Sequence, residues 1–189
     1  MKRIEFISGN NVYFVSPSSI SYQLRLRRRF SEYDFGAFDS YNVRQINGER
    51  YCGLLVNDEA IEVGDKFQSC PHVKALKERF VDGKEWRDTG YSELHEVWYK
   101  RFFKGRENAS FSDLYEDKLK GWDQVYLDIK KNGYKASENP LDNIQVCIDK
   151  DGGFLFIDGR HRLFFAQILG IEKVPVVANI ISKTWASSQ

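Results

Sequence analysis

The chain has 189 residues, of which 42% are hydrophobic and 29% are charged, and its formal net charge is +1. Such a chain can form one globular domain of ordinary size or a core with an appendage, and its charge gives no overall attraction to nucleic acid or to an anionic membrane. The three cysteines are widely spaced, which argues against a disulfide scaffold and against a zinc ribbon. Because no apolar run is long enough for a signal peptide or a membrane span, we expect a cytoplasmic protein that binds no membrane.

The first 70 residues predict strands. Residues 13–15 form an apolar run that ends at a Ser-Pro-Ser-Ser turn, and residues 22–30 alternate between apolar and polar side chains. Two further runs, residues 52–56 and 60–63, flank a short polar stretch and predict a hairpin.

The alternation in residues 22–30 places Arg25, Arg27 and Arg29 on one face of the predicted strand. Such a row could follow the phosphates of a nucleic acid, or it could be a solvated face that protects a sheet edge. We favour the second interpretation, so DNA is a possible partner but not the favoured one.

Apolar residues between positions 71 and 133 recur at spacings of three and four, which predicts helices. The first helix begins near Pro71, has Val73, Leu76 and Phe80 on its apolar side, and could end at Gly83, while the second covers residues 92–103. The third begins at Ser112, as its cap, and ends at a C-cap glycine, Gly133.

After residue 139 the pattern changes to short strands and one helix. Residues 144–148 and 154–157 predict a hairpin around a tight turn. A buried helix is then predicted from Arg160 to Leu169, and a last strand at residues 174–181.

The sequence Asp158-Gly159-Arg160-His161-Arg162 joins this hairpin to the buried helix. A helix N-terminus already favours an anion, and three cationic side chains there would repel the helix dipole unless something negative bound nearby. We therefore expect a phosphate site in which Gly159 lets the ligand approach the backbone and Arg160 and Arg162 bind oxygens. His161 would donate or move a proton, while Asp158 would be a helix cap in the structural interpretation and a base or metal ligand in the functional one.

The C-terminal part resembles the ParB/sulfiredoxin fold over about residues 112–181. The resemblance rests on the following segments: Asn132-Gly133-Tyr134, Asn139-Pro140, Ile144-Gln145-Val146, Gly153 to Ile157, Asp158 to Arg162, Ala166, Leu169-Gly170 and Val174-Pro175-Val176. It implies a nucleotide-phosphate site at the Asp158–Arg162 turn.

Within this superfamily the turn is most similar to that of a free-serine kinase, whose Asp-Gly-His-His-Arg sequence matches Asp158, Gly159, His161 and Arg162 position by position. In that kinase the aspartate and the histidine take part in phosphoryl transfer, which implies catalytic roles for Asp158 and His161. Sulfiredoxins carry a cysteine where Arg160 stands, so sulfinic-acid reduction is not expected. ParB-type proteins carry a DNA-binding helix-turn-helix after the fold, and here only residues 182–189 follow the last strand.

We thus expect an α+β fold, with a ParB/sulfiredoxin-like phosphate-binding core at residues 111–189. Residues 1–110 would add a β-rich region and a helical middle of unknown function. The expected function is phosphoryl transfer or NTP hydrolysis, with ATP or another NTP or NDP, with Mg²⁺ and with an unknown small-molecule or macromolecular acceptor.

Two alternatives stay open: a non-catalytic nucleotide- or DNA-associated binding module, and a scaffold with a degenerate site. The second catalytic carboxylate is unassigned, and no metal ligand is assigned. The candidates for that carboxylate are Glu116, Asp117, Asp142 and Asp149.

Overall fold

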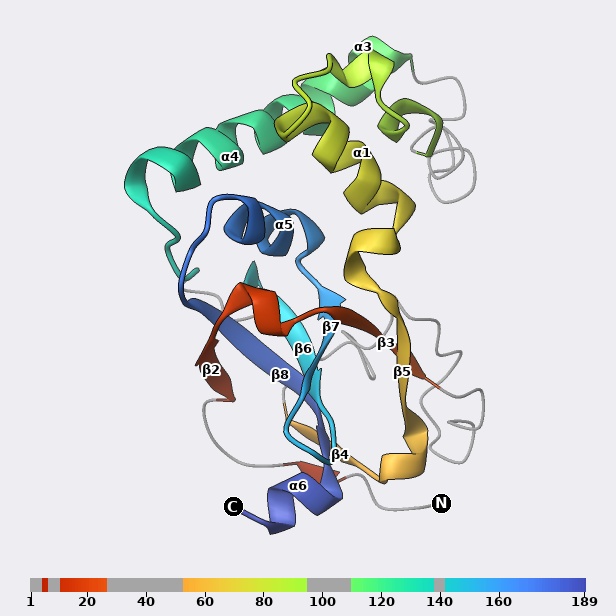
Figure 1. Cartoon of the computed structure of the whole chain (residues 1–189), viewed down its shortest axis with the longest axis vertical. Helices are drawn as coiled ribbons and strands as arrows, with labels where there is room; N and C mark the ends of the chain where they lie inside the picture. Colours follow the sequence, from red (N-terminus) through yellow and green to blue (C-terminus); the bar gives the residue numbers. More distant parts are fainter. Residues whose placement is uncertain (1–4, 7–10, 27–52, 95–109, 138–141) are drawn as a thin grey trace.

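A computed structural model describes residues 5–6, 11–26, 53–94, 110–137 and 142–189 (Figure 1). The strands are β1 (Glu5–Phe6), β2 (Val12–Val15), β3 (Tyr22–Leu26), β4 (Leu54–Val56), β5 (Ile61–Lys66), β6 (Ile144–Ile148), β7 (Phe154–Asp158) and β8 (Val174–Ser182). The helices are α1 (Pro71–Phe80), α3 (Phe111–Leu114), α4 (Lys120–Asn132), α5 (Arg160–Ile168) and α6 (Lys183–Ser187). The class is therefore α+β, as the sequence predicts.

The described strands form one eight-stranded mixed sheet in the order β1-β4-β8-β6-β7-β3-β5, and β2 also pairs with β8. Every residue of β6 and β8 is buried, which fits their high content of β-branched residues. β6 and β7 form the predicted hairpin, while β6 and β8 run parallel. The centre of the sheet thus comes from the C-terminal part of the chain.

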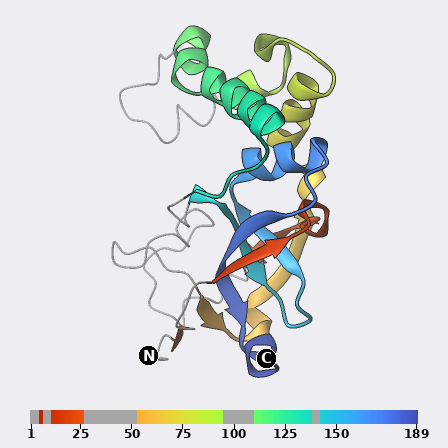
Figure 2. The same cartoon turned by 90° about the vertical axis from the view of Figure 1, so that its left-hand side faces the viewer.

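Helix α5 lies between the sheet and the pair α1 and α4 (Figures 1 and 2). Four consecutive α5 residues are buried, from Leu163 to Ala166, because the helix has neighbours on both sides. The ring of Phe165 lies 4.7 Å from that of Phe80 in α1 and 5.4 Å from that of Tyr126 in α4. This aromatic layer fixes α5, and with it the turn that begins at Asp158.

Two predicted features are wrong. Residues 52–63 do not form a hairpin, because β4 pairs with β1 and β8 while β5 pairs with β3. Ser112 is not a helix cap, because Ser110 takes that position and forms a capping box with Asp113. In both cases the local pattern was compatible with the prediction, and pairing or hydrogen bonding outside the pattern decided the outcome.

The other predicted elements agree with the structure where it describes them. α1 begins at Pro71, the third helix ends at Gly133, and α5 and β8 lie where expected. The strand predicted over residues 22–30 is described only to Leu26, and the helix predicted over 92–103 only to residue 94. None of the described helices is long and apolar enough to span a bilayer.

The division at residue 110 stays a prediction. Strands from both parts share the sheet, since β3 pairs with β7 and β2 pairs with β8.

Replacing Phe165 by alanine should lower the free energy of unfolding by about 3–5 kcal/mol, because the side chain is fully buried between α1 and α4. Urea denaturation measures the change. Leu127→Ala on α4 is the control, since that side chain is 61% exposed and should cost less than about 0.5 kcal/mol. Equal losses in the two variants would contradict the placement of α5.

Candidate functional site

Gly159 makes the sharp turn between β7 and α5. It is the N-cap residue of the helix, in the left-handed conformation at φ 84° and ψ 32°. A Cβ atom at this position would lie 3.0 Å from the Cα of Ile144 and 3.3 Å from the carbonyl oxygen of Asn143. Packing against β6 therefore requires a glycine here, whether or not a ligand also approaches its backbone.

Asp158 ends β7 at an irregular point of the hairpin. Gln145 pairs with Asp158 and Val146 pairs with Phe156, so two β7 residues lie opposite one residue of β6. Bulges of this kind redirect the side chains beside them and are common next to active sites. Asp158 lies one position before the helix cap, which is Gly159.

The first turn of α5 contains Arg160, His161 and Arg162 and no acidic residue. The Nε atom of Arg160 and the Nη1 atom of Arg162 are buried and have no hydrogen-bond acceptor in the described part of the chain. No carboxylate among the described residues forms an ion pair with either guanidinium. A buried charged donor without an acceptor costs at least about 1–3 kcal/mol, and a negatively charged ligand would remove that cost.

The groups around the two arginines are not acidic. Burial, together with the charge of Arg160, lowers the pKa of His72 in α1 to about 4. Burial raises the pKa of Tyr134, which follows α4, to about 12, although the charge of Arg162 acts in the opposite direction. At neutral pH both neighbours are uncharged, so they leave the positive charge of the arginines in place.

The ring of His161 stacks on Trp122 of α4, with a centroid distance of 3.7 Å and an interplanar angle of 25°. Tyr91 lies beside both histidine rings, 6.4 Å from that of His161 and 5.6 Å from that of His72. These contacts hold His161 in one orientation at the start of α5.

The candidates for a second carboxylate lie in different parts of the fold. Asp142 directly precedes the Asn143–Ile144 segment on which Gly159 packs. Asp149 lies at the far end of the hairpin, where its Oδ1 accepts from the backbone N–H groups of residues 151 and 153. Glu116 is paired with Lys120 at 3.0 Å, and the side chain of Asp117 is outside the described part. Asp142 is the candidate whose place in the fold is nearest to Asp158.

Within the described ranges, no group of three or more His, Cys, Asp or Glu side chains could hold a metal ion. Magnesium in nucleotide sites is often held by one or two carboxylates together with the phosphates. Asp158, with Asp142 as a second candidate, fits that kind of site and does not fit a metal cage made by the protein alone.

The predicted basic strand face is described only in part. Arg25 is exposed and lies 3.8 Å from Asp65, while Arg27 and Arg29 lie outside the described residues.

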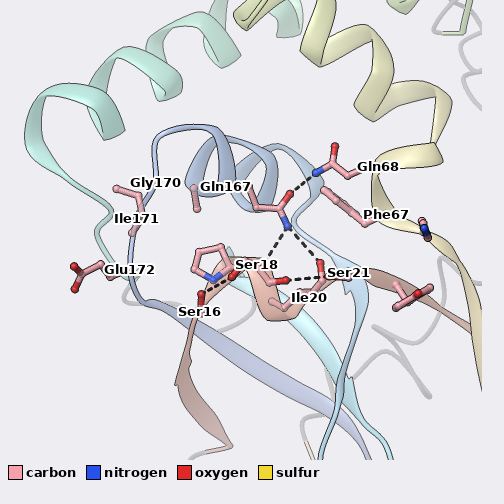
Figure 3. A pocket seen from close by; sticks show the side chains of 14 residues that line it. Ser16, Ser18, Ile20, Ser21, Phe67, Gln68, Gln167, Gly170, Ile171 and Glu172 are labelled. Carbon is pink, nitrogen blue, oxygen red and sulfur yellow. Dashed lines mark hydrogen bonds between the residues drawn. The ribbon is translucent and has the colours of Figure 1, made fainter.

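A hollow of about 740 Å³ lies beside the C-terminal half of α5 (Figure 3). Its central polar group, the Gln167 amide, donates to the carbonyl oxygens of Pro17 and Ile20 at 3.0 and 3.3 Å and accepts from Gln68 at 2.6 Å. This amide therefore serves to connect α5 to residues 17–20 and 68. The hollow is separate from the cationic turn, which lies at the other end of the helix.

Sequence reasoning did not find three neighbours of the turn: His72, Tyr91 and Trp122. Neither His72 nor Trp122 lies near residue 158 in the sequence, so no local pattern connects them to the turn. Tyr134 entered only through the fold resemblance. Its position after a C-cap glycine is the one sequence signal for a fixed side chain there.

His72 should make the stability of the protein depend on pH. Its folded-state pKa is lowered, so between pH 6.5 and about 4 the unfolded chain binds a proton that the folded protein does not. The free energy of unfolding should therefore fall as the pH decreases through this range, by less than the ~1.4 kcal/mol per pH unit of a full proton, since the ring is partly exposed.

The measurement is urea denaturation of the wild type and of His72→Gln at pH 7, 5.5 and 4.5. The difference between the two proteins isolates His72 from the carboxylates. If both proteins lose the same stability, His72 is not buried beside Arg160 as described.

Neither family models nor curated proteins nor solved structures give a match to this chain.

Proposed function

We propose that the first turn of α5 binds the phosphates of a nucleotide and that the protein transfers or hydrolyses a phosphoryl group there. The observation that supports this most strongly is the pair of buried guanidinium nitrogens without acceptors, Arg160 Nε and Arg162 Nη1. Phosphate and carboxylate are the common biological anions whose oxygens match the forked donors of arginine.

A structural explanation of the two arginines is weaker. Structural cations at a helix normally lie near its C-terminus, where the dipole is negative, and here they lie at the opposite end. Within the described part of the chain, no acid compensates them. A bound anion supplies the missing charge and can also accept hydrogen bonds from backbone N–H groups at the start of the helix.

In this proposal Arg160 and Arg162 bind the phosphates, beside the turn that Gly159 makes. His161, held against Trp122, donates to the transferring group. Asp158, at the bulge, acts as the base toward the acceptor or as a ligand of a phosphate-bound Mg²⁺, which would neutralise phosphate charge when present. We also propose a cytoplasmic protein related to the ParB/sulfiredoxin superfamily, with the free-serine kinases as its nearest functional model.

The alternative is a module that binds a nucleotide without catalysis. Catalytic turnover distinguishes the two, because the phosphate contacts are common to both. The described residues contain no observation that favours a DNA surface, since Arg25 is exposed and already near Asp65.

Binding is tested by a thermal-shift panel of ATP, ADP, CTP and GTP, each with and without Mg²⁺. A nucleotide at about 100 times its dissociation constant should stabilise the wild type by ~2.7 kcal/mol, a shift of several degrees. Arg162→Met should lose this shift, while the melting temperature of the unliganded protein should stay equal or rise, since the variant removes a buried donor without an acceptor.

Arg87→Met is the matched control, because Arg87 is exposed and lies outside the turn. An Arg162→Met variant that melts lower and binds as the wild type does would assign a structural role to this arginine.

Catalysis is tested by measuring nucleotide turnover in Asp158→Asn. The rate should fall by about 100-fold or more, as is typical on removal of a general base, while the nucleotide-induced thermal shift is retained. Wild-type protein that binds a nucleotide but forms no product with water or with a panel of hydroxyl acceptors would favour the binding module.

A further inference from the structure

Tyr134 lies in the segment that follows α4, between two anchored points of the backbone. On one side it follows Gly133, the residue that ends α4, whose N–H donates to the carbonyl oxygen of Ile129 at 2.9 Å. On the other side the backbone of Ser137 is bonded twice to the Asn143 side chain, at 2.9 and 3.3 Å.

The same Asn143 segment supports the Asp158–Arg162 turn. The backbone of Asn143 and Ile144 is the surface on which Gly159 packs, and Gly159 is the first residue of the junction into α5. In Figure 2 the described residues that follow α4 pass one end of α5. Tyr134 and Arg162 are thus fixed relative to each other through Asn143, although 28 positions separate them in the sequence.

Both side chains have a buried polar atom without a partner. Among the described residues, neither the hydroxyl oxygen of Tyr134 nor Nη1 of Arg162 makes a hydrogen bond. The phenol stays protonated at neutral pH, because burial raises its pKa to about 12. The arginine is always charged and has no acceptor atom, so the pair presents two donors and lacks an acceptor for either of them.

The charge of Arg162 acts on the phenol and opposes the rise in its pKa. The phenol oxygen could accept a hydrogen bond from the guanidinium, but that bond is not formed. Buried donors without an acceptor among the described residues are costly to fold, and a phosphate group, which has several oxygens, could accept from both of them.

We propose that Tyr134 is a further ligand-binding residue, whose hydroxyl and Arg162 donate to oxygens of the same phosphate group. This inference rests on the proposed function, since it needs the anion at the start of α5. The neutral phenol adds a directional hydrogen-bond donor without adding charge. It therefore selects a group with several acceptor oxygens in a fixed geometry, as a terminal or bridging phosphoryl group of a nucleotide has.

The test uses pyrophosphate and ADP as probes, with dissociation constants from isothermal titration calorimetry. Tyr134→Phe should weaken binding of both by about tenfold or more, the usual effect of one hydrogen bond to a charged group. Its unliganded melting temperature should not fall, because the lost hydroxyl has no partner to lose. Tyr126→Phe, a half-buried tyrosine of α4 that packs on Phe80 and Phe165, is the matched control and should bind as the wild type does.

A double-mutant cycle adds the second readout. If Tyr134 and Arg162 bind one group, the loss in Tyr134→Phe/Arg162→Met should be smaller than the sum of the two single losses. In protein labelled with ¹³C at tyrosine Cζ, the signal that disappears in Tyr134→Phe should move when pyrophosphate is added.

The two proposals fail in different ways. Wild-type protein that binds neither pyrophosphate nor any nucleotide would overturn the proposed function and this inference with it. Wild-type binding that Arg162→Met abolishes and Tyr134→Phe leaves unchanged would overturn the inference alone.

Discussion

The structure depends on one uncompensated charge: the first turn of α5 holds two half-buried arginines, and each has a buried nitrogen with no acceptor among the described residues. Removing charge from water is costly, and a fold usually repays this cost with a paired acid or with additional hydrogen bonds. Here the surrounding side chains that respond to the arginines, His72 and Tyr134, remain neutral at physiological pH. When no ligand is present, packing in the rest of the fold must therefore offset the free energy lost at these unpaired donors.

That support comes from the aromatic layer above α5. Phe80, Tyr126 and Phe165 lock the helix between the sheet and the two covering helices, and Trp122 holds the His161 ring. Phe80, Trp122 and Tyr126 come from the middle of the chain, while Phe165 and the turn come from its C-terminal part. A rigid site is thereby assembled from both regions, which is the arrangement that binding and catalysis require of supporting side chains.

Much of the C-terminal half could be predicted from sequence. The β6–β7 hairpin, the turn at Gly159 and the extent of α5 follow from local patterns: two short apolar runs around a tight turn, a glycine after the second run, and a further apolar run. Strand pairing in the N-terminal half could not be predicted in the same way. β4 is adjacent to β5 in sequence but pairs with β8, because the partner is chosen by the whole sheet and not by the short turn at Asp58–Ala60.

The site shows the same limit. The residues of the turn are contiguous, so their chemistry is visible in the sequence, whereas His72, Tyr91 and Trp122 reach them only through packing. Tyr134 is predictable in part. The glycine before it marks a helix end in the sequence, whereas the absence of a partner for its hydroxyl among the described residues is visible only in the folded structure.

The interleaved sheet also determines when the protein can fold during its synthesis. Leu54 pairs with Ile180, and Val12 pairs with Val177, so strands made early on the ribosome wait for β8, which is made almost last. Pairings between positions so far apart close large loops and slow the search for the native topology. Until β8 emerges, the early strands have unpaired edges, and chaperone protection in that interval would matter more for this chain than for one built from sequential hairpins.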